Sequence, residues 1–250
     1  MPTFQILALV LKVYNFSEAD RIAVLFTNKL GKIRGLAKGV RKSKSRLSAV
    51  LDLLSLAKIQ VYSKKNQSDF LIVTQGQLLN SFSKIKADLK TLGQAARWLE
   101  LVDNLISERQ ELLGIFNLLV SALTLLENGL DVDKVGIWFE INLLSQLGYK
   151  PNFSTCQVCG IHTQETNYSL ENNDITCKAC KNNNNNILIS QVHQIILEKM
   201  LRMKPSLMLK LTLHDQQIHD LKKLLAAIFN YHIGKDLKSN KFYNAIKELD

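Results

Sequence analysis

The chain has 250 residues, of which 46% are hydrophobic and 22% are charged, so its composition is that of a globular protein and excludes a wholly disordered one. The net charge is +10. Residues 1–83 carry 13 Lys and Arg against 4 Asp and Glu, whereas residues 84–250 carry 19 against 18. The excess is therefore confined to the first third, and such a field attracts polyanions, nucleic acid first and an anionic membrane surface second.

The sequence predicts neither a membrane span nor an export signal. No segment reaches the roughly 18 to 20 apolar residues that a spanning helix needs. The amino terminus, MPTFQILALVLK, lacks the charged region and the small-residue cleavage site of a signal peptide. With four cysteines and no export signal, we expect a cytoplasmic location in which thiols stay reduced, so disulfides are a poor interpretation of the cysteines.

The first 80 residues predict a small β domain. Five short segments rich in Ile, Val, Leu and aromatic residues are separated by turn-forming groups such as NFSEAD and SKKNQSD. No long helix separates them, which favours a closed barrel. The five-stranded OB-fold fits the number and length of the segments, but the pattern does not distinguish it from other small barrels. The expected strands are Ile6–Val13, Arg21–Thr27, Lys32–Ala37, Ser55–Tyr62 and Phe70–Gln75.

From about Asp88 the apolar residues follow a helical period. The segment DLKTLGQAARWLELVDNLI repeats them at spacings of three and four. Further helices are predicted at Glu111–Glu127, Asp133–Leu147, Ser190–Met203, Asp215–His232 and Lys241–Leu249. The predicted class is α+β, with an OB-fold domain at residues 1–80 and a helical domain at residues 81–250 that carries a zinc-ribbon-like insertion at about 153–186.

The four cysteines form two CxxC pairs, Cys156-Gln-Val-Cys159 and Cys177-Lys-Ala-Cys180, separated by seventeen residues. Each pair can offer two thiolates to one ion, and the loop between them lets the pairs complete a tetrahedron. This zinc-ribbon spacing favours one structural Zn²⁺ per chain, because four thiolates leave no position for a catalytic water. The alternatives to a zinc site are a redox or iron–sulfur role and cysteines without a shared role. His162 lies in the loop between the pairs and can in principle replace a thiolate.

No motif indicates catalysis. The phosphate-loop pattern GxxxxGK[ST] is missing, as are HExxH and GxSxG. Glu18 and Asp20 are close enough in sequence to serve as metal ligands of a nuclease, but a turn that places Asp20 beside Arg21 explains them more simply. We therefore expect a protein that is not an enzyme.

Several stretches together resemble the RecO family of bacterial DNA repair and recombination proteins. The run ALVLKVYNFSEADRIAVLFTNKLGKIRGLAKGVRKSKSRL is similar to the family's opening signature, with its E-x-D-R turn and G-K-x-R-G-x-A-K-G block. WLELVDNL and FEINLLSQLGYKPNFSTCQVCG resemble the helical segments, and GKDLKSNKF resembles the carboxy-terminal LKS motif. The resemblance implies an OB-fold followed by a helical domain with a zinc-finger-like insertion.

The resemblance also implies a function. Members of the family bind single- and double-stranded DNA, anneal complementary strands, interact with RecR and with the single-stranded DNA-binding protein SSB, and help RecA load onto SSB-coated DNA. For this chain it implies a recombination mediator at the bacterial nucleoid, with no small-molecule substrate.

The stretch GKIRGLAKGVRKSKSR at residues 31–46 is the expected DNA-binding surface. It holds seven basic residues and no acid, and in an OB-fold the strands and their connecting loops form a groove for a phosphate backbone. A solvated loop is the simpler alternative. Tyr14, Phe16 and Tyr62 are candidates for base stacking or for packing. The predicted DNA-binding residues are Lys32, Arg34, Lys38, Arg41, Lys42, Lys44 and Arg46.

Charge and cysteine spacing leave two other functional hypotheses. A zinc-ribbon, RNA-associated protein of the ribosome or transcription machinery fits both features, and a metal-dependent nuclease would use Glu18 and Asp20. Strand annealing with a preference for single-stranded DNA favours the first hypothesis, structured RNA the second, and cleavage with Mg²⁺ the third.

Overall fold

The computed structural model describes residues 3–41, 45, 47–63, 70–149, 152–161, 165–180 and 186–233. They divide into two compact units, one ending at Glu127 and the other beginning at Asn128. The helix predicted at Lys241–Leu249 lies outside the described residues. No helix within the described ranges combines the length and the apolar character needed to cross a membrane.

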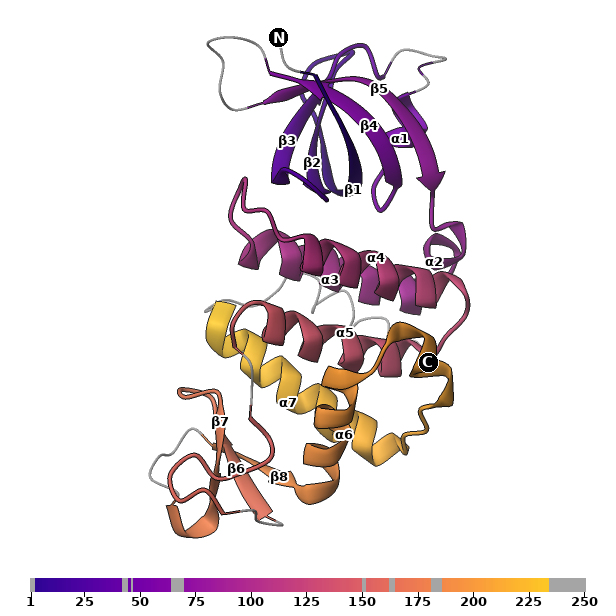
Figure 1. The fold of residues 1–250 in the computed structure, drawn as a ribbon. Helices are drawn as coiled ribbons and strands as arrows, with labels where there is room; N and C mark the ends of the chain where they lie inside the picture. The colour runs from indigo at the N-terminus through magenta and orange to yellow at the C-terminus, as the bar shows by residue number, and fades with distance from the viewer. Residues whose placement is uncertain are drawn as a thin grey trace. The chain divides into compact units, whose positions relative to one another are not determined.

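Unit 1 begins with a five-stranded sheet that closes into a barrel in the order β1-β2-β3-β5-β4, with β4 pairing back onto β1 (Figure 1). All neighbouring strands are antiparallel except β3 and β5, which pair in parallel. The five strands are β1 (Thr3–Asn15), β2 (Arg21–Thr27), β3 (Gly31–Ala37), β4 (Leu56–Tyr62) and β5 (Leu71–Asn80).

The interior of the barrel is filled by aliphatic side chains from alternate strand positions. On β4, Ala57, Ile59 and Val61 are buried while Lys58 is exposed, the two-residue period of a half-buried strand. The short helix α1 (Leu47–Val50) packs on β5, where a Cβ at Gly76 would lie 2.5 Å from the Val50 side chain. Glycine at that position is therefore what lets the helix approach the strand.

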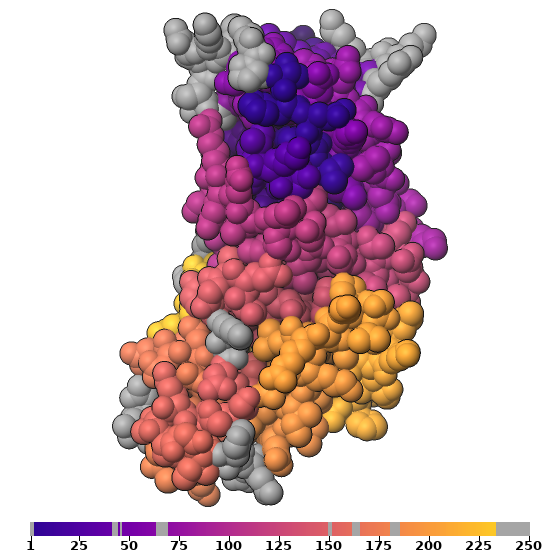
Figure 2. All heavy atoms as spheres, in the orientation of Figure 1, coloured from indigo at the N-terminus to yellow at the C-terminus, as the bar shows by residue number. Residues whose placement is uncertain are grey.

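Three further helices follow the barrel in the described part of unit 1: α2 (Ser83–Ala87), α3 (Leu89–Leu105) and α4 (Leu113–Glu127). Asp88 caps α3 by accepting a hydrogen bond from the Thr91 amide at 2.8 Å. The helices cover part of the outside of the barrel, where Phe26 of β2 meets Phe116 of α4 edge to face at 5.8 Å. In the space-filling view the indigo atoms of β1 meet the magenta helical residues (Figure 2). This cover decides which barrel residues remain exposed.

Unit 2 is built around α5 (Val132–Gln146), which packs against α6 (Gln191–Arg202) and α7 (Asp215–Ile233). Ser190 caps α6 through the His193 amide. A three-stranded sheet in the order β7-β6-β8 interrupts the helices. Its strands are β6 (Glu165–Ser169), β7 (Asp174–Cys177) and β8 (Asn186–Ser190), and the 3₁₀ turns are η1 (Lys178–Cys180) and η2 (Pro205–Lys210).

The predicted mixed α+β chain, with five N-terminal strands and a helical C-terminal part, is confirmed. The helix predicted at Asp133–Leu147 is observed as α5, with its bounds shifted by one residue. The pattern of the sequence does not predict β8, because its apolar run, Ile187–Ile189, is only three residues long and follows a row of asparagines.

Candidate nucleic-acid interface and cysteine cluster

The basic stretch forms β3 and the turn that follows it. Of the seven predicted DNA-binding residues, the structure describes four: Lys32, Arg34, Lys38 and Arg41. The other three, Lys42, Lys44 and Arg46, lie outside the described residues. The four described residues occupy three different environments, and these differ in how far each cation is already neutralised.

Lys32 lies on the covered side of the barrel and is only 9% exposed. Its ammonium group contacts the Asp103 carboxylate of α3 at 3.1 Å and donates to the Asp103 backbone carbonyl. Lys12 of β1 contacts the same carboxylate at 2.5 Å. Burial alone would raise the pKa of Asp103, but the hydrogen bonds from both lysines outweigh it and hold that pKa below its usual value. Lys32 thus serves to join β3 to α3.

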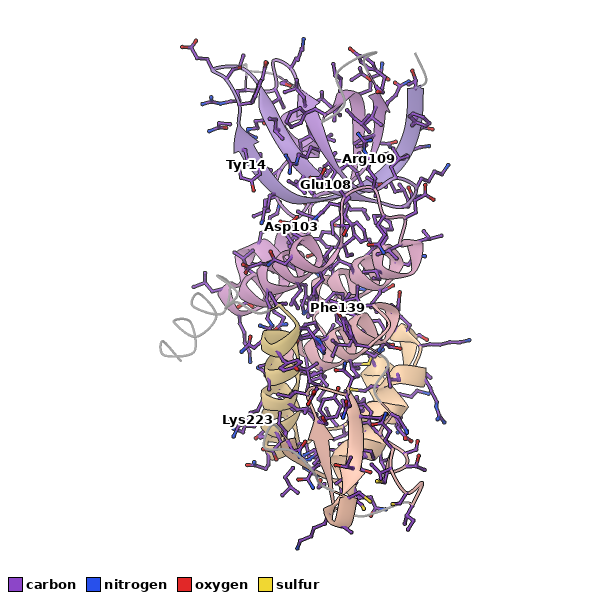
Figure 3. All side chains as sticks on the ribbon, turned by 90° about the vertical axis from the view of Figure 1, so that its left-hand side faces the viewer. Tyr14, Asp103, Glu108, Arg109, Phe139 and Lys223 are labelled. Atoms are coloured by element: carbon purple, nitrogen blue, oxygen red, sulfur yellow. The ribbon has the colours of Figure 1, made fainter. Side chains whose placement is uncertain are left out.

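Arg34 lies two residues farther along β3 and is half exposed. Its guanidinium pairs with the Glu108 carboxylate at 2.8 Å, and the two side chains are 49% and 48% exposed. Glu108 follows α3 and lies at the edge of the barrel, near Asp103 and Arg109 (Figure 3). A half-exposed pair of this kind is weak and open to competing anions.

Lys38 and Arg41 lie in the turn after β3, and both are exposed. The turn is hydrogen-bonded to the β1–β2 loop: the Arg41 guanidinium donates to the Ser17 carbonyl at 2.8 Å, and the Arg41 amide donates to the Ala19 carbonyl at 3.0 Å. Within the described residues, no carboxylate pairs with either cation. This end of the barrel therefore presents cations that are free to meet phosphate.

Exposed aromatic rings lie at the end of β1 and in the loop that follows it. Tyr14 is 52% exposed and Phe16 is 59% exposed. Phe16 lies 6.5 Å from the ring of Phe70, which the sequence did not single out. Tyr62 is only partly exposed. Two rings thus accompany the free cations of the neighbouring turn.

The acidic residues of this loop are explained by its structure. The Asp20 carboxylate accepts a hydrogen bond at 2.7 Å from the amide of Gly39, a residue whose φ of +66° favours glycine. Ser17 accepts from the Asp20 amide at 3.1 Å, and Glu18 is exposed. Asp20 therefore holds the basic turn in place, through a contact with Gly39 that the sequence did not predict.

The four predicted metal ligands come together in unit 2. The sulfur atoms of Cys156, Cys159, Cys177 and Cys180 all lie within 4.8 Å of one another, and those of Cys159 and Cys177 are 3.8 Å apart. A tetrahedron of thiolates around one metal ion at 2.3 Å spaces its sulfur atoms by about 3.8 Å. The donor set and its spacing therefore fit a metal ion.

Local backbone geometry positions the first cysteine pair. Gly160, with a φ of +71°, donates its amide to the Cys156 carbonyl at 2.8 Å, which closes a tight turn around the CxxC pair. The Cys156 sulfur accepts from the Cys177 amide at 3.3 Å. Burial opposes ionisation of Cys156, but this and other backbone amides outweigh it and lower its pKa to about 6. Hydrogen bonds with the Cys177 and Cys159 side chains raise the pKa of Cys180 to about 12, so the four thiols do not ionise equally readily.

Aromatic and polar contacts join the cysteine region to the helices of unit 2. Phe153 stacks on Tyr168 of β6 at 5.9 Å, and both are buried. Asn173, in the turn between β6 and β7, accepts a hydrogen bond at 2.7 Å from His232 of α7. Tyr149 stacks on the His232 ring at 4.1 Å, and burial lowers the pKa of that histidine. These contacts make the cysteine region an integral part of unit 2.

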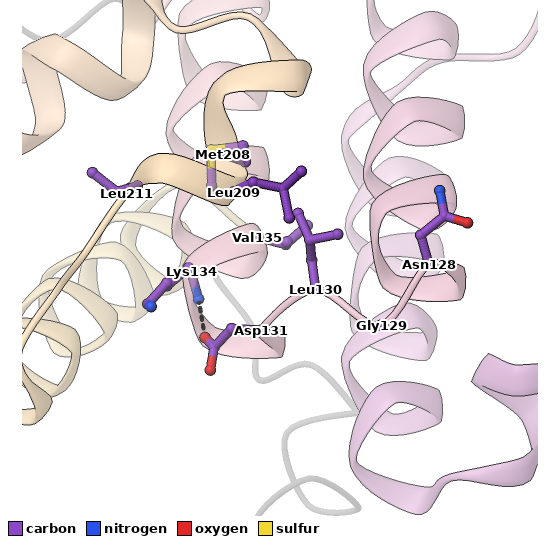
Figure 4. Close-up of a pocket in the computed structure, with 9 residues that line it drawn as sticks. All are labelled: Asn128, Gly129, Leu130, Asp131, Lys134, Val135, Met208, Leu209 and Leu211. Atoms are coloured by element: carbon purple, nitrogen blue, oxygen red, sulfur yellow. Dashed lines mark hydrogen bonds between the residues drawn. The ribbon is translucent and has the colours of Figure 1, made fainter.

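Unit 2 also contains a small pocket of about 240 Å³ at the start of α5 (Figure 4). Its walls are mainly the aliphatic side chains of Leu130, Val135, Met208, Leu209 and Leu211. Asp131 is engaged in capping the helix through the Lys134 amide at 2.9 Å. The nine residues that line the pocket include no histidine, cysteine or hydroxyl-bearing side chain.

Comparison with known proteins decides the family. A family model described as "Recombination protein O N terminal" matches residues 1–82, and one described as "Recombination protein O C terminal" matches residues 86–241. The chain belongs to the RecO family. This membership gives the chain a role in DNA repair and recombination.

RecO relatives align with nearly the whole chain. A protein named DNA repair protein RecO from Dehalococcoides mccartyi strain CBDB1 is 29% identical over 249 residues, covering 99% of this chain and 97% of its own. The RecO protein of Desulforamulus reducens is 27% identical over 249 residues, covering 98% and 96%. That of Dehalococcoides mccartyi strain 195 is 36% identical over 191 residues, covering 75% and 74%.

Proposed function

We propose that the chain is a DNA-binding recombination mediator that anneals complementary strands and acts without catalysis. The observation that carries this proposal is the junction of two segments at one end of the barrel. There the turn with Lys38 and Arg41 is hydrogen-bonded to the loop that follows Tyr14 and contains Phe16. Cations that meet phosphates, beside rings that stack on bases, are the two elements of single-strand binding without sequence preference.

The barrel would act as an OB-fold in this function, as the first of two domains divided near residue 80. The proposed DNA surface contains Arg34, Lys38 and Arg41 and continues through Lys42, Lys44 and Arg46. Lys32 is left out of it, because it is only 9% exposed and its ammonium group is held by the Asp103 carboxylate. Such a surface favours annealing, since it offsets the repulsion between two strands and leaves their base edges free to pair.

The metal ion would be Zn²⁺, held by Cys156, Cys159, Cys177 and Cys180 in a structural role. Zinc supplies four strong thiolate bonds and, with its shell closed, no reactive water. The chain's own residues do the rest: the backbone amides around Cys156 stabilise its thiolate, and His232 fastens the turn between β6 and β7 to α7.

The proposed partners follow from the family resemblance. They are RecR, SSB and single- and double-stranded DNA, with the outcome that RecA loads onto SSB-coated single strands, in the bacterial cytoplasm at the nucleoid.

The test is the annealing rate of two complementary oligonucleotides, with and without bound SSB, in the absence of nucleotide and Mg²⁺. We expect the protein to accelerate annealing, the acceleration to fall steeply with salt, and both effects to shrink in a variant with Lys38, Arg41, Lys42 and Lys44 replaced by Ala. A requirement for ATP, or equal rates in the wild type and the folded variant, would refute the mechanism. Tighter binding to structured RNA would favour the RNA-associated hypothesis, and Mg²⁺-dependent cleavage the nuclease.

A further inference from the structure

The cations of the basic stretch are neutralised to different degrees along the chain. Lys38 and Arg41, in the turn, have no carboxylate partner among the described residues, Arg34 has a half-exposed one, and Lys32 has a buried one. The two carboxylates, Glu108 and Asp103, come from α3 and the segment after it, about 70 residues downstream. The positive surface therefore ends on β3 at Arg34.

The backbone holds Glu108 in this position. The amide of Arg109 donates to the Lys32 carbonyl at 2.9 Å, and Glu108 forms an isolated parallel bridge with Lys32. The segment passes so close to the barrel that a Cβ at Gly31 would lie 2.1 Å from the Gln110 carbonyl oxygen. Glu108 is therefore fixed beside β3 by main-chain contacts, and its carboxylate meets Arg34 without help from a mobile loop.

A carboxylate on an arginine occupies the position that a phosphate would take. Both anions accept hydrogen bonds from the guanidinium group, and arginine binds either one in the same planar geometry. Because the Arg34 and Glu108 side chains are 49% and 48% exposed, a strand that follows the positive surface can reach Arg34, where its phosphate competes with the Glu108 carboxylate for the guanidinium group.

We propose that the Glu108 carboxylate pairs with the Arg34 guanidinium group in place of a DNA phosphate. Glu108 thereby weakens single-strand binding and determines where the DNA-binding surface ends on β3. This inference rests on the proposed DNA-binding function. It adds that Arg34, the last cation of the surface, contacts DNA when a phosphate takes the place of the Glu108 carboxylate.

The test compares Glu108→Gln with Glu111→Gln in binding to a fluorescent single-stranded oligonucleotide over a range of salt concentrations. Glu111 is exposed, lies three residues away and has no ion pair among the described residues, so it controls for net charge. We expect E108Q to bind about two- to fivefold more tightly than E111Q, which is the range spanned by one exposed ion pair. Its plot of log K against log salt should be steeper by about 0.7, one extra phosphate contact.

Arg34→Gln supplies a second and independent measurement. R34Q should weaken binding more in the E108Q background, where it removes the whole gain, than in the wild-type background, where Glu108 competes with phosphate for the guanidinium group. This arm keeps the inference testable even if one single variant folds poorly, and thermal melting monitors folding in each case.

Two results would overturn the inference. If E108Q and E111Q bind alike, only net charge matters; if E108Q binds more weakly than the wild type, Glu108 assists DNA binding. In both cases the wild type still binds DNA with a salt dependence, so the proposed function stands. If the wild type shows no salt-dependent binding at all, the proposed function itself fails and the inference fails with it.

Discussion

The cysteine region and the basic stretch were both conspicuous in the sequence, and their structures differ in an instructive way. The two CxxC pairs bring all four predicted ligands to one place. The basic stretch is divided instead, because Lys32 is neutralised by a buried carboxylate while Lys38 and Arg41 stay exposed. A metal motif contains its own partners at short spacing, whereas a run of like charges does not reveal which of its members acquire a partner from a distant segment.

Loss of a cysteine ligand should have the largest effect on the molecule. Cys177→Ser replaces one of the four thiolates with a hydroxyl group at a buried position. Bound zinc should therefore fall from about one ion per chain to well below that. Structural zinc in small peptides contributes about 10–16 kcal/mol of apparent binding free energy. Because α6 and α7 also pack on α5, we expect the cysteine region to unfold while the helices persist.

Elemental analysis of protein purified without chelator, with amide hydrogen exchange to locate the unfolding, measures both parts of this prediction. Ser154→Ala is a matched control in the same segment, since it removes the hydrogen bond to Glu198 of α6 but no ligand. Wild-type protein without zinc, or C177S with a full complement, would contradict a four-thiolate site.

The sequence predicted those parts of the fold that depend on local pattern. The bounds of β2 are those expected, and the caps of α3 and α6 are acidic or hydroxyl residues at the predicted starts. Strand β5 runs five residues beyond the predicted end at Gln75. The prediction ended too early because Gly76 and its polar neighbours resemble a turn in the sequence. In the structure, Gly76 makes room for Val50, a contact that no local pattern contains.

The same limit applies to the site. The cysteine cluster was predictable because its ligands lie in two short motifs joined by one loop. The division of the basic stretch was not, because Asp103 and Glu108 reach β3 through tertiary packing alone. Lys32 and Arg34 are two residues apart on β3 and therefore lie on one side of the strand, but this spacing cannot show that α3 covers the Lys32 end of that side.

The buried carboxylate provides the next test of this comparison. In Asp103→Asn the ammonium groups of Lys12 and Lys32 lose their counter-charge. Removing one partner of a buried ion pair costs about 3–5 kcal/mol. Since Lys12 is partly exposed, we expect the free energy of unfolding to fall by about 2–4 kcal/mol. Asp52→Asn, which breaks the exposed pair with Lys86, is the control and should cost less than about 1 kcal/mol.

The sign of the pH dependence follows from the lowered pKa of Asp103. The contribution of the ionised Asp103 carboxylate to the free energy of unfolding is fully present above the unfolded-state pKa of about 3.9. It is lost as the pH falls through the lower folded-state pKa. Urea unfolding of the wild type and D103N should therefore differ at pH 7 and converge in acid. Equal stability of D103N and D52N at pH 7 would show that Lys32 is not held as the structure indicates.

A smaller effect is expected from the exposed cations, and it should appear mainly in DNA binding. Lys38→Gln with Arg41→Gln removes two phosphate contacts, so the slope of log K against log salt should flatten by about 1.4, with an affinity loss of roughly tenfold. Lys58→Gln, an exposed lysine on β4, is the control for net charge. An equal loss in K58Q would mean that the whole positive field, and not this turn, attracts the strand.

The smallest effect should come from the aromatic rings beside these cations. Tyr14→Ala removes a ring that is 52% exposed, and stacking of one base on such a ring contributes about 1–3 kcal/mol; because Tyr14 lies at the rim, we expect the lower end, an affinity loss of about fivefold. Phe4→Ala, 39% exposed near the other end of β1, is the matched control and should bind like the wild type.

The salt dependence separates stacking from charge. A ring carries no charge and releases no counterion, so Y14A should lower the affinity by the same factor at every salt concentration, whereas the variant of Lys38 and Arg41 loses most at low salt. If Y14A instead flattens the salt slope, the ring acts by positioning the neighbouring basic turn. If it changes nothing, the exposed end of the basic stretch binds through charge alone, and the contrast between its free and neutralised cations accounts for the whole interface.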